Sequence, residues 1–211
     1  MTRNPPAPPL IISPPERIDR MKSYPTLPQG YVPFASIDLL RNKKQFWIVN
    51  GLSIALCVLM LIPPFLWGYS LFFGGDGSLS ASFLRLGAAL VGLLAYIALH
   101  ELTHGIVMMA CGARVHYGYK VAYAYAGSYA YFTRSAYIVI ALAPVVLWGI
   151  VFAVLTACLP REWFWAVWLW QLMNVSGAAG DFYCTCRILR TPRETLVQDT
   201  GTAMTFYCKT N

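Results

Sequence analysis

His100, Glu101 and His104 form an HExxH motif, and no other residues of the chain have types and spacing so well suited to chemistry. On a helix, positions i and i+4 lie one above the other, so both imidazoles can bind one zinc ion. Glu101 lies between them, where a carboxylate can act on a water held by that zinc. The motif therefore predicts metal-assisted hydrolysis.

The surroundings of the motif strengthen this interpretation. The motif lies inside an apolar stretch that predicts a membrane span, and ionisable residues at bilayer depth are costly and usually functional. The alternative is a hydrogen-bonded histidine pair packed in a helix interior. In lipid, that alternative leaves polar groups whose burial costs several kcal/mol when they are unpaired.

A catalytic zinc needs a third protein ligand and one open position. The chain has nine acidic residues and three histidines, and of the acidic residues only Glu101 and Asp181 fall at hydrocarbon depth. Asp181 is the leading third ligand, because it lies about as deep in its own span as His100 does. His116, beyond a helix break at Gly112, is the competing ligand.

Small residues fill the stretch from Asn174 to Asp181, and small side chains let helices approach closely in lipid. Asn174 lies two helical turns before Asp181, on roughly the same face. Its amide is placed either to bind a substrate carbonyl or to fix a metal ligand. An ordinary interhelical hydrogen bond is an equally good interpretation of Asn174.

The composition excludes an ordinary soluble domain. Of the 211 residues, 57% are hydrophobic and 12% are charged. The net charge of +7 does not indicate a nucleic-acid partner, because the charges flank apolar runs, which is typical of membrane topology and of anionic lipid headgroups. The six cysteines have no spacing typical of a disulfide framework or of a CxxC zinc site.

Three regions follow from the distribution of apolar and proline residues. We expect a Pro-rich disordered tail over residues 1–30, an integral membrane domain over 31–190 and a short cytoplasmic segment over 191–211. Each apolar run of the membrane domain is near the ~20 residues that a spanning helix needs. The predicted spans are about 46–73, 82–111, 135–159 and 163–188. Lys and Arg are concentrated in both termini and in the 112–134 loop, so these parts are predicted to be cytoplasmic.

The 112–134 loop has a period of two, with Tyr and Val at odd positions from Val115 to Tyr131. This alternation favours strands, and residues 126–128 supply a turn for a hairpin. A tyrosine-rich interfacial loop is the alternative. The expected fold is thus an all-α membrane protein of about four transmembrane helices, with a small cytoplasmic β-hairpin between the second and third.

Several motifs resemble those of a bacterial family of small membrane proteins described as zincin peptidases, and more distantly those of site-2-type intramembrane metalloproteases. The motifs are Leu27-Pro28-Gln29-Gly30-Tyr31 before the first span, HELTH-Gly105 in the second, and Asn174, Ser176-Gly177 and Gly180-Asp181 in the last. The resemblance covers most of residues 27–208. It implies His100, His104 and Asp181 as zinc ligands and Glu101 as the base. The chain departs from the site-2 pattern near Asp181, where it has no proline and where Phe182 follows.

Together these features predict a zinc metalloprotease of the bacterial inner membrane that cuts membrane-protein or peptide substrates near the cytoplasmic face. Its partners would be membrane lipid and that substrate, with no nucleic acid. The alternatives are a non-enzymatic metal-binding membrane scaffold or inactive relative, and an ion transporter. Glu101 separates the enzyme from the scaffold, because a structural metal site has no need of that acid.

Overall fold

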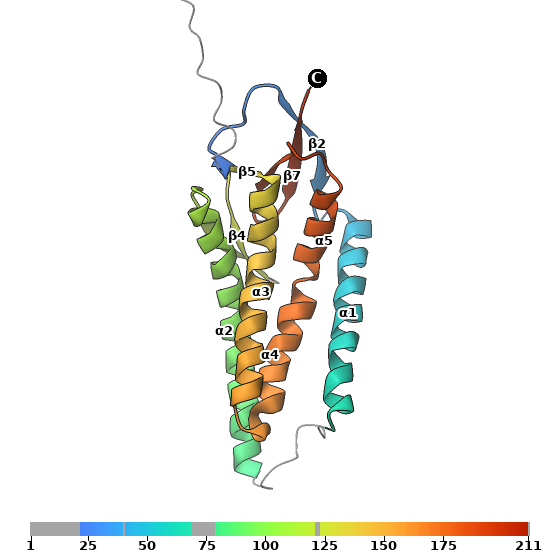
Figure 1. The fold of residues 1–211 in the computed structure, drawn as a ribbon, viewed down its shortest axis with the longest axis vertical. Coiled ribbons are helices and arrows are strands. Elements are labelled where there is room, and N and C mark those ends of the chain that lie inside the picture. The colour runs from blue at the N-terminus through green and yellow to red at the C-terminus, as the bar shows by residue number, and fades with distance from the viewer. Residues whose placement is uncertain (1–21, 40, 69–78, 121–122, 211) are drawn as a thin grey trace, which may run out of the picture.

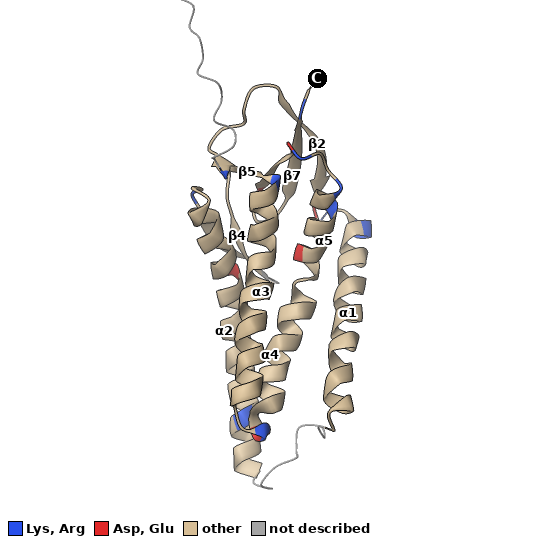
Figure 2. Cartoon of the chain, in the orientation of Figure 1, with Lys and Arg blue, Asp and Glu red and all other residues tan. Residues whose placement is uncertain are grey.

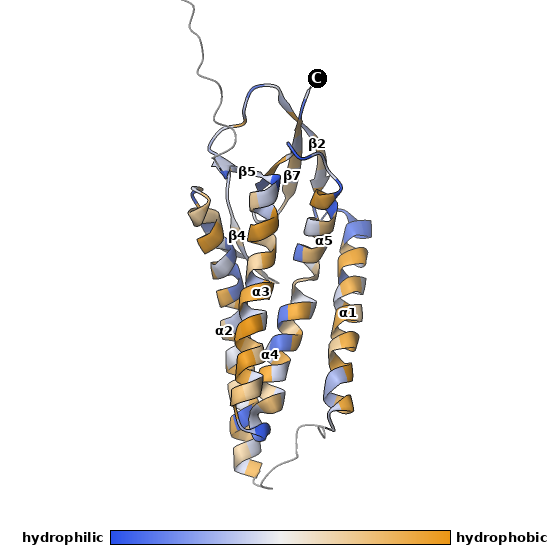
Figure 3. Cartoon of the chain, in the orientation of Figure 1, coloured by the Kyte–Doolittle hydropathy of each residue, from blue (hydrophilic) through white to orange (hydrophobic). Residues whose placement is uncertain are grey.

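The computed structural model describes residues 22–39, 41–68, 79–120 and 123–210. Long helices run side by side, and strands gather at one end of them (Figure 1). Most of the predicted Pro-rich tail and the end of the first predicted span, residues 69–73, lie outside the described residues. Lys and Arg lie near both ends of the helices, while the helix bodies are mostly apolar (Figures 2 and 3).

Two of the long helices begin where a capping side chain accepts from the first backbone N–H groups. Asn42 accepts from the backbone N–H groups of Lys44 and Gln45 at the start of the helix Lys43–Leu66, and Thr133 accepts from that of Ala136 at the start of the helix Arg134–Cys158. The helices are α1 (Lys43–Leu66), α2 (Leu79–Ala110), α3 (Arg134–Cys158), α4 (Phe164–Gly177) and α5 (Ala179–Leu189), with a short 3-10 helix, η1 (Arg161–Trp163), before α4.

Three of the described helices, α1, α2 and α3, are long and apolar enough to cross a membrane. The fourth predicted span, 163–188, is not one continuous helix. It is divided at Ala178, which separates the 14-residue α4 from the 11-residue α5. Glycines flank the break at Gly177 and Gly180, and glycine weakens a helix interior. As a result Asp181 lies in the first turn of α5, where the helix dipole favours a negative charge.

The prediction of an all-α fold is wrong, because the chain is mixed α/β. Five strands form an antiparallel sheet in the order β1-β5-β6-β7-β2. Their bounds are β1 (Ser23–Tyr24), β2 (Tyr31–Ile37), β5 (Tyr131–Thr133), β6 (Leu196–Asp199) and β7 (Met204–Lys209). The sheet joins segments from both ends of the chain, and such pairing leaves no local periodicity in a sequence. β1 lies within the stretch predicted as tail.

A second sheet has two antiparallel strands, β3 (His116–Lys120) and β4 (Tyr123–Gly127), so the 112–134 loop does contain paired strands. The turn was predicted at the wrong place. Residues 126–128 lie at and just beyond the end of β4, and the link between the strands, 121–122, lies outside the described residues. β5, at the end of the same loop, belongs to the five-stranded sheet.

The packing of the helices leaves room for a site between α1 and α2. α1 packs on α4 and α5, whereas α2 packs on α3, α4 and β4. At the end nearest the sheet, the helices and strands share one apolar core, whose buried members include Met108, Phe132, Ile140, Ile188 and Phe206. This core fixes the five-stranded sheet relative to α2, α3 and α5, and β4 packs directly on α2.

Candidate metal centre

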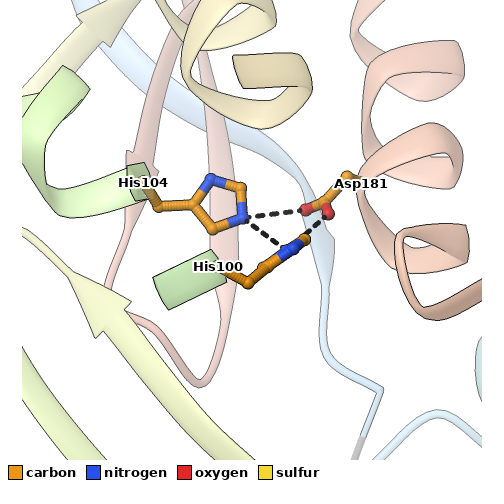
Figure 4. A group of neighbouring side chains, drawn as sticks. All are labelled: His100, His104 and Asp181. Atoms are coloured by element: carbon orange, nitrogen blue, oxygen red, sulfur yellow. Dashed lines mark hydrogen bonds and ion pairs between the residues drawn. The ribbon is translucent and has the colours of Figure 1, made fainter. Parts of the chain in front are cut away.

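His100 and His104 of α2 and Asp181 of α5 converge on one point (Figure 4). The Nε2 atoms of the two histidines are 3.2 Å apart. Oδ2 of Asp181 lies 3.3 Å from Nε2 of His100, and Oδ1 of Asp181 lies 3.5 Å from Nε2 of His104. The two imidazoles lie one helical turn apart on the same face of α2, as the spacing predicts. The expected meeting of Asp181 with the histidine pair is also present.

His104 has its other ring nitrogen fixed by the backbone. Nδ1 lies 2.9 Å from the carbonyl oxygen of Ile140 in α3. A carbonyl can only accept a hydrogen bond, so in neutral His104 the ring proton is on Nδ1. The Nε2 lone pair then points toward His100 and Asp181.

His100 has its ring proton fixed through two further side chains. The amide nitrogen of Asn174 donates to the carbonyl of Val145 at 3.1 Å, so the amide oxygen of Asn174 is the acceptor for the Tyr96 hydroxyl at 2.8 Å. The hydroxyl uses its one proton in that bond. It must therefore accept from Nδ1 of His100, which lies 2.8 Å away.

When both imidazoles are neutral, three acceptors therefore face one another with no donor among them: two imidazole lone pairs and the Asp181 carboxylate. Such an arrangement is unfavourable unless a cation lies between them. For tetrahedral zinc with bonds of roughly 2.0–2.2 Å to nitrogen and oxygen, ligand atoms lie about 3.3–3.5 Å apart. The observed separations are of this size, although the two Asp181 distances involve different carboxylate oxygens. The three possible ligand atoms lie within 4.8 Å of one another, and the donor set of two histidines and one carboxylate suits a zinc ion with one open position.

Glu101 lies beside this group and is held by the hairpin. Its Oε2 atom accepts a 2.9 Å hydrogen bond from the backbone nitrogen of Ala126 in β4. Glu101, the three clustered side chains and Ala124–Ala126 line one cavity of about 410 Å³. Phe46 and Asn50 of α1 line the same cavity. The carboxylate therefore faces a space that can admit a small segment of peptide and a water.

Two other predicted site residues lie away from the centre. His116 is on β3, where it stacks on Tyr129 and approaches the carbonyl of Thr200, and the structure does not bring it to the cluster. Asn174 is fully buried and does not line the cavity. Asn174 forms interhelical hydrogen bonds, to Tyr96 of α2 and to the carbonyl of Val145 in α3, and it reaches His100 through Tyr96.

Tyr96 links Asn174 to His100 and was not predicted from the sequence as a site residue. The available signal was its position one helical turn before His100 on the same face of α2. Its ring is buried against Trp148 and Phe152, so only the hydroxyl has a polar role.

A second polar pair, the buried Tyr137 and the half-buried Asp199, was also not predicted from the sequence. Both line the site cavity, and the Tyr137 hydroxyl donates to the Asp199 carboxylate. Burial raises the pKa of Asp199, although the bonds from Tyr137 and from the backbone nitrogen of Gly201 oppose this rise. The hydrogen bond between them joins α3 to the end of β6, and both side chains line the cavity.

Residues 93–196 match the model of a protein family described as "Putative zincin peptidase". The matched stretch contains the HExxH motif, the hairpin, Asn174 and Asp181, and the predicted resemblance to this family is confirmed. The more distant resemblance to site-2-type proteases stays a prediction. No curated protein and no solved structure gave a significant match to the chain.

Proposed function

We propose, from the match to this peptidase family and from the geometry of the centre, that the protein is a membrane-embedded zinc metallopeptidase. One observation carries the proposal: His100, His104 and Asp181 present three acceptor atoms to one point, beside the carboxylate of Glu101. A purely structural metal site would need His100, His104 and Asp181 but would have no use for the Glu101 carboxylate.

The residues of the chain have separate tasks in the proposed reaction. When bound, zinc would polarise the scissile carbonyl and lower the pKa of a water molecule. Glu101 takes a proton from the attacking water and delivers it to the leaving amine. The Ala126 N–H holds the Glu101 carboxylate in place. Tyr96 and the Ile140 carbonyl keep the ring protons of the two histidines on Nδ1.

The strand β4 offers a place for the substrate. Among the described strands β4 pairs only with β3, and its residues Ala124–Ala126 line the cavity beside Glu101. An extended peptide can add to such an edge through backbone hydrogen bonds. A helical substrate would first have to unwind, because its peptide groups are bonded within the helix.

The proposed membrane placement rests on three apolar helices and on the distribution of charge. α1 exposes large apolar side chains along its length, such as Ile54, Val58 and Leu59. By the positive-inside rule, the end of the bundle that carries the five-stranded sheet and the hairpin is cytoplasmic. The centre lies nearer this end, so we propose cleavage near the cytoplasmic face of a bacterial inner membrane.

Metal content and cleavage, measured together, test the proposal. We expect about one zinc per chain in detergent-purified protein, lost in His104→Ala and Asp181→Asn and kept in His116→Ala. A library of quenched fluorescent transmembrane peptides in micelles should be cleaved by the wild-type protein. Glu101→Gln should keep zinc and lose about 10²- to 10⁴-fold in rate, whereas Glu162→Gln should change neither.

The contrary outcomes are distinct. No zinc in the wild-type protein after zinc is supplied would exclude the hydrolase. Zinc binding with cleavage unaffected by Glu101→Gln would exclude Glu101 as the base. Zinc binding with no cleavage of any library member would favour the metal-binding scaffold.

A further inference from the structure

A second cavity, of about 500 Å³, lies between the start of α1 and the end of α5. It is separate from the site cavity, because each helix gives it different residues. α1 contributes Lys44 and Ile48 to the second cavity but Phe46 and Asn50 to the site cavity. The second cavity is also lined by Asn42, Gln45, Tyr183, Cys186, Arg187 and Arg190.

The charged side chains of this cavity are all basic: Lys44 from α1, and Arg187 and Arg190 from α5 and its end. Among the described residues, none of the three forms an ion pair with a carboxylate. Arg41, just before the start of α1, does form an ion pair, because its Nε lies 3.8 Å from Oδ2 of Asp38. Three like charges around one space repel one another, and a bound anion would relieve that repulsion.

The helix terminus itself does not account for an anion site here. The side chain of Asn42 already accepts from the backbone N–H groups of Lys44 and Gln45. The binding groups are therefore the side chains of Lys44, Arg187 and Arg190. An arginine fork suits the oxygens of a phosphate group, and a lysine adds a point charge.

The apolar surface beside the cavity indicates where the phosphate comes from. Ile48 lines the cavity and is 45% exposed, and the neighbouring Trp47 is 71% exposed. Both lie on α1, just past its basic first turn and within a helix apolar enough to cross a membrane. Figures 2 and 3 show this change from a charged helix end to an apolar helix body. A ligand that fits both parts has an anionic head and acyl chains.

We propose that this cavity binds the phosphate headgroup of an anionic phospholipid, with Lys44, Arg187 and Arg190 on the phosphate and the acyl chains along α1. Basic clusters at the cytoplasmic end of spanning helices are suited to such headgroups. The lipid would join α1 to α5, the helix that carries Asp181. This inference rests on the membrane placement in the proposed function, and it is independent of the zinc chemistry.

Lipid binding to the whole chain tests the site. Delipidated protein in neutral detergent is titrated with phosphatidylglycerol or phosphatidylcholine of the same acyl chains, and bound lipid is counted by native mass spectrometry. We expect one tightly bound phosphatidylglycerol per chain and weaker binding of phosphatidylcholine. Each basic side chain near an anionic headgroup contributes about fivefold, so the triple variant Lys44→Gln/Arg187→Gln/Arg190→Gln should bind about a hundredfold more weakly.

A matched variant removes the same charge from the same end of the molecule. Arg114→Gln/Arg193→Gln/Lys209→Gln changes three exposed basic residues outside the cavity, and its affinity for phosphatidylglycerol should equal that of the wild-type protein. Equal losses in the two triple variants would overturn the site, as would equal binding of the two lipids. Inorganic phosphate that displaces the lipid at equal concentration would overturn the lipid source.

Two further variants keep the test decisive if the triple variant fails to fold. Arg187→Lys/Arg190→Lys preserves the charges and should keep most of the affinity, and Arg190→Gln alone should lose about fivefold. Full affinity in Arg190→Gln would contradict the proposal. A loss of lipid selectivity leaves the hydrolase proposal intact, whereas protein that stays soluble without detergent would overturn both.

Discussion

The Tyr96 hydroxyl donates a 2.8 Å hydrogen bond to Oδ1 of Asn174, a residue 78 positions later in the chain. Both residues are buried, and neither lines the site cavity. Their bond nevertheless decides which nitrogen of His100 carries the proton. The bond therefore connects the packing of α2 against α4 with the ability of His100 to hold a metal.

Tyr96→Phe removes this hydroxyl and keeps the ring. Nδ1 of His100 then loses its acceptor, and the imidazole is no longer held with Nε2 free. Loss of such an outer partner costs about 10- to 100-fold in metal affinity. Competition with a fluorescent zinc chelator measures the effect, and Tyr129→Phe on the exposed surface should change nothing. Zinc affinity equal to that of wild type would show that the hydroxyl does not orient His100.

Asn174→Ala should weaken zinc binding through the same route. Asn174 contacts Tyr96, and Tyr96 contacts His100. The Tyr96→Phe/Asn174→Ala double variant should therefore bind zinc only slightly more weakly than the single variant with the lower zinc affinity. A double-mutant cycle on zinc affinity tests this. Additive losses in the double variant would indicate that Asn174 acts on the centre independently of Tyr96.

Gly127 lies where the end of β4 meets the backbone at Thr200. A Cβ at Gly127 would lie 2.5 Å from the carbonyl carbon of Thr200, so Gly127→Ala must displace backbone. We expect a loss of about 1–3 kcal/mol in stability. Peptide cleavage should also fall, because β4 holds Glu101 through Ala126.

Gly87 is the matched control, since a Cβ there meets nothing within 4 Å. Gly87→Ala should leave the midpoint of thermal unfolding and the cleavage rate unchanged or slightly raised. Equal melting temperatures for the two alanine variants would mean that the hairpin does not dock at Thr200 as described.

Asp199 should make stability depend on pH. Burial raises its pKa above the ordinary value of 3.8, so the folded chain binds this proton more tightly than the unfolded chain. As pH rises from 3.8 toward the raised pKa, the free energy of unfolding should fall, because the folded state must give up a proton that it prefers to keep.

Asp199→Asn removes this titration, and the comparison isolates it from other acids. Thermal unfolding in detergent, followed over the same pH range, should show wild type losing stability relative to the variant as pH rises. Parallel curves for the two proteins would contradict the raised pKa.

Features formed within one helix or one loop were predicted correctly from the sequence more often than contacts between segments that lie far apart in the chain. His100, Glu101 and His104 lie within one stretch of helix, so their common face follows from helical periodicity alone. The strands inside the 112–134 loop carried a local alternation and are present. β2 was missed, because its partner β7 lies at the far end of the chain, and Pro33 within it argues against a strand.

The sequence by itself determined the HExxH helix and the shortage of charge that favours a membrane protein. It also reduced the candidates for a third metal ligand to Asp181 and His116. Only the tertiary structure decided that Asp181 lies beside the histidine pair, that Asn174 bonds to Tyr96, and that Ala126 bonds to Glu101. The physical reason is the range of the interactions. Periodicity and composition act within a few turns of chain, whereas these contacts join different elements and depend on how α2, α5 and β4 pack together.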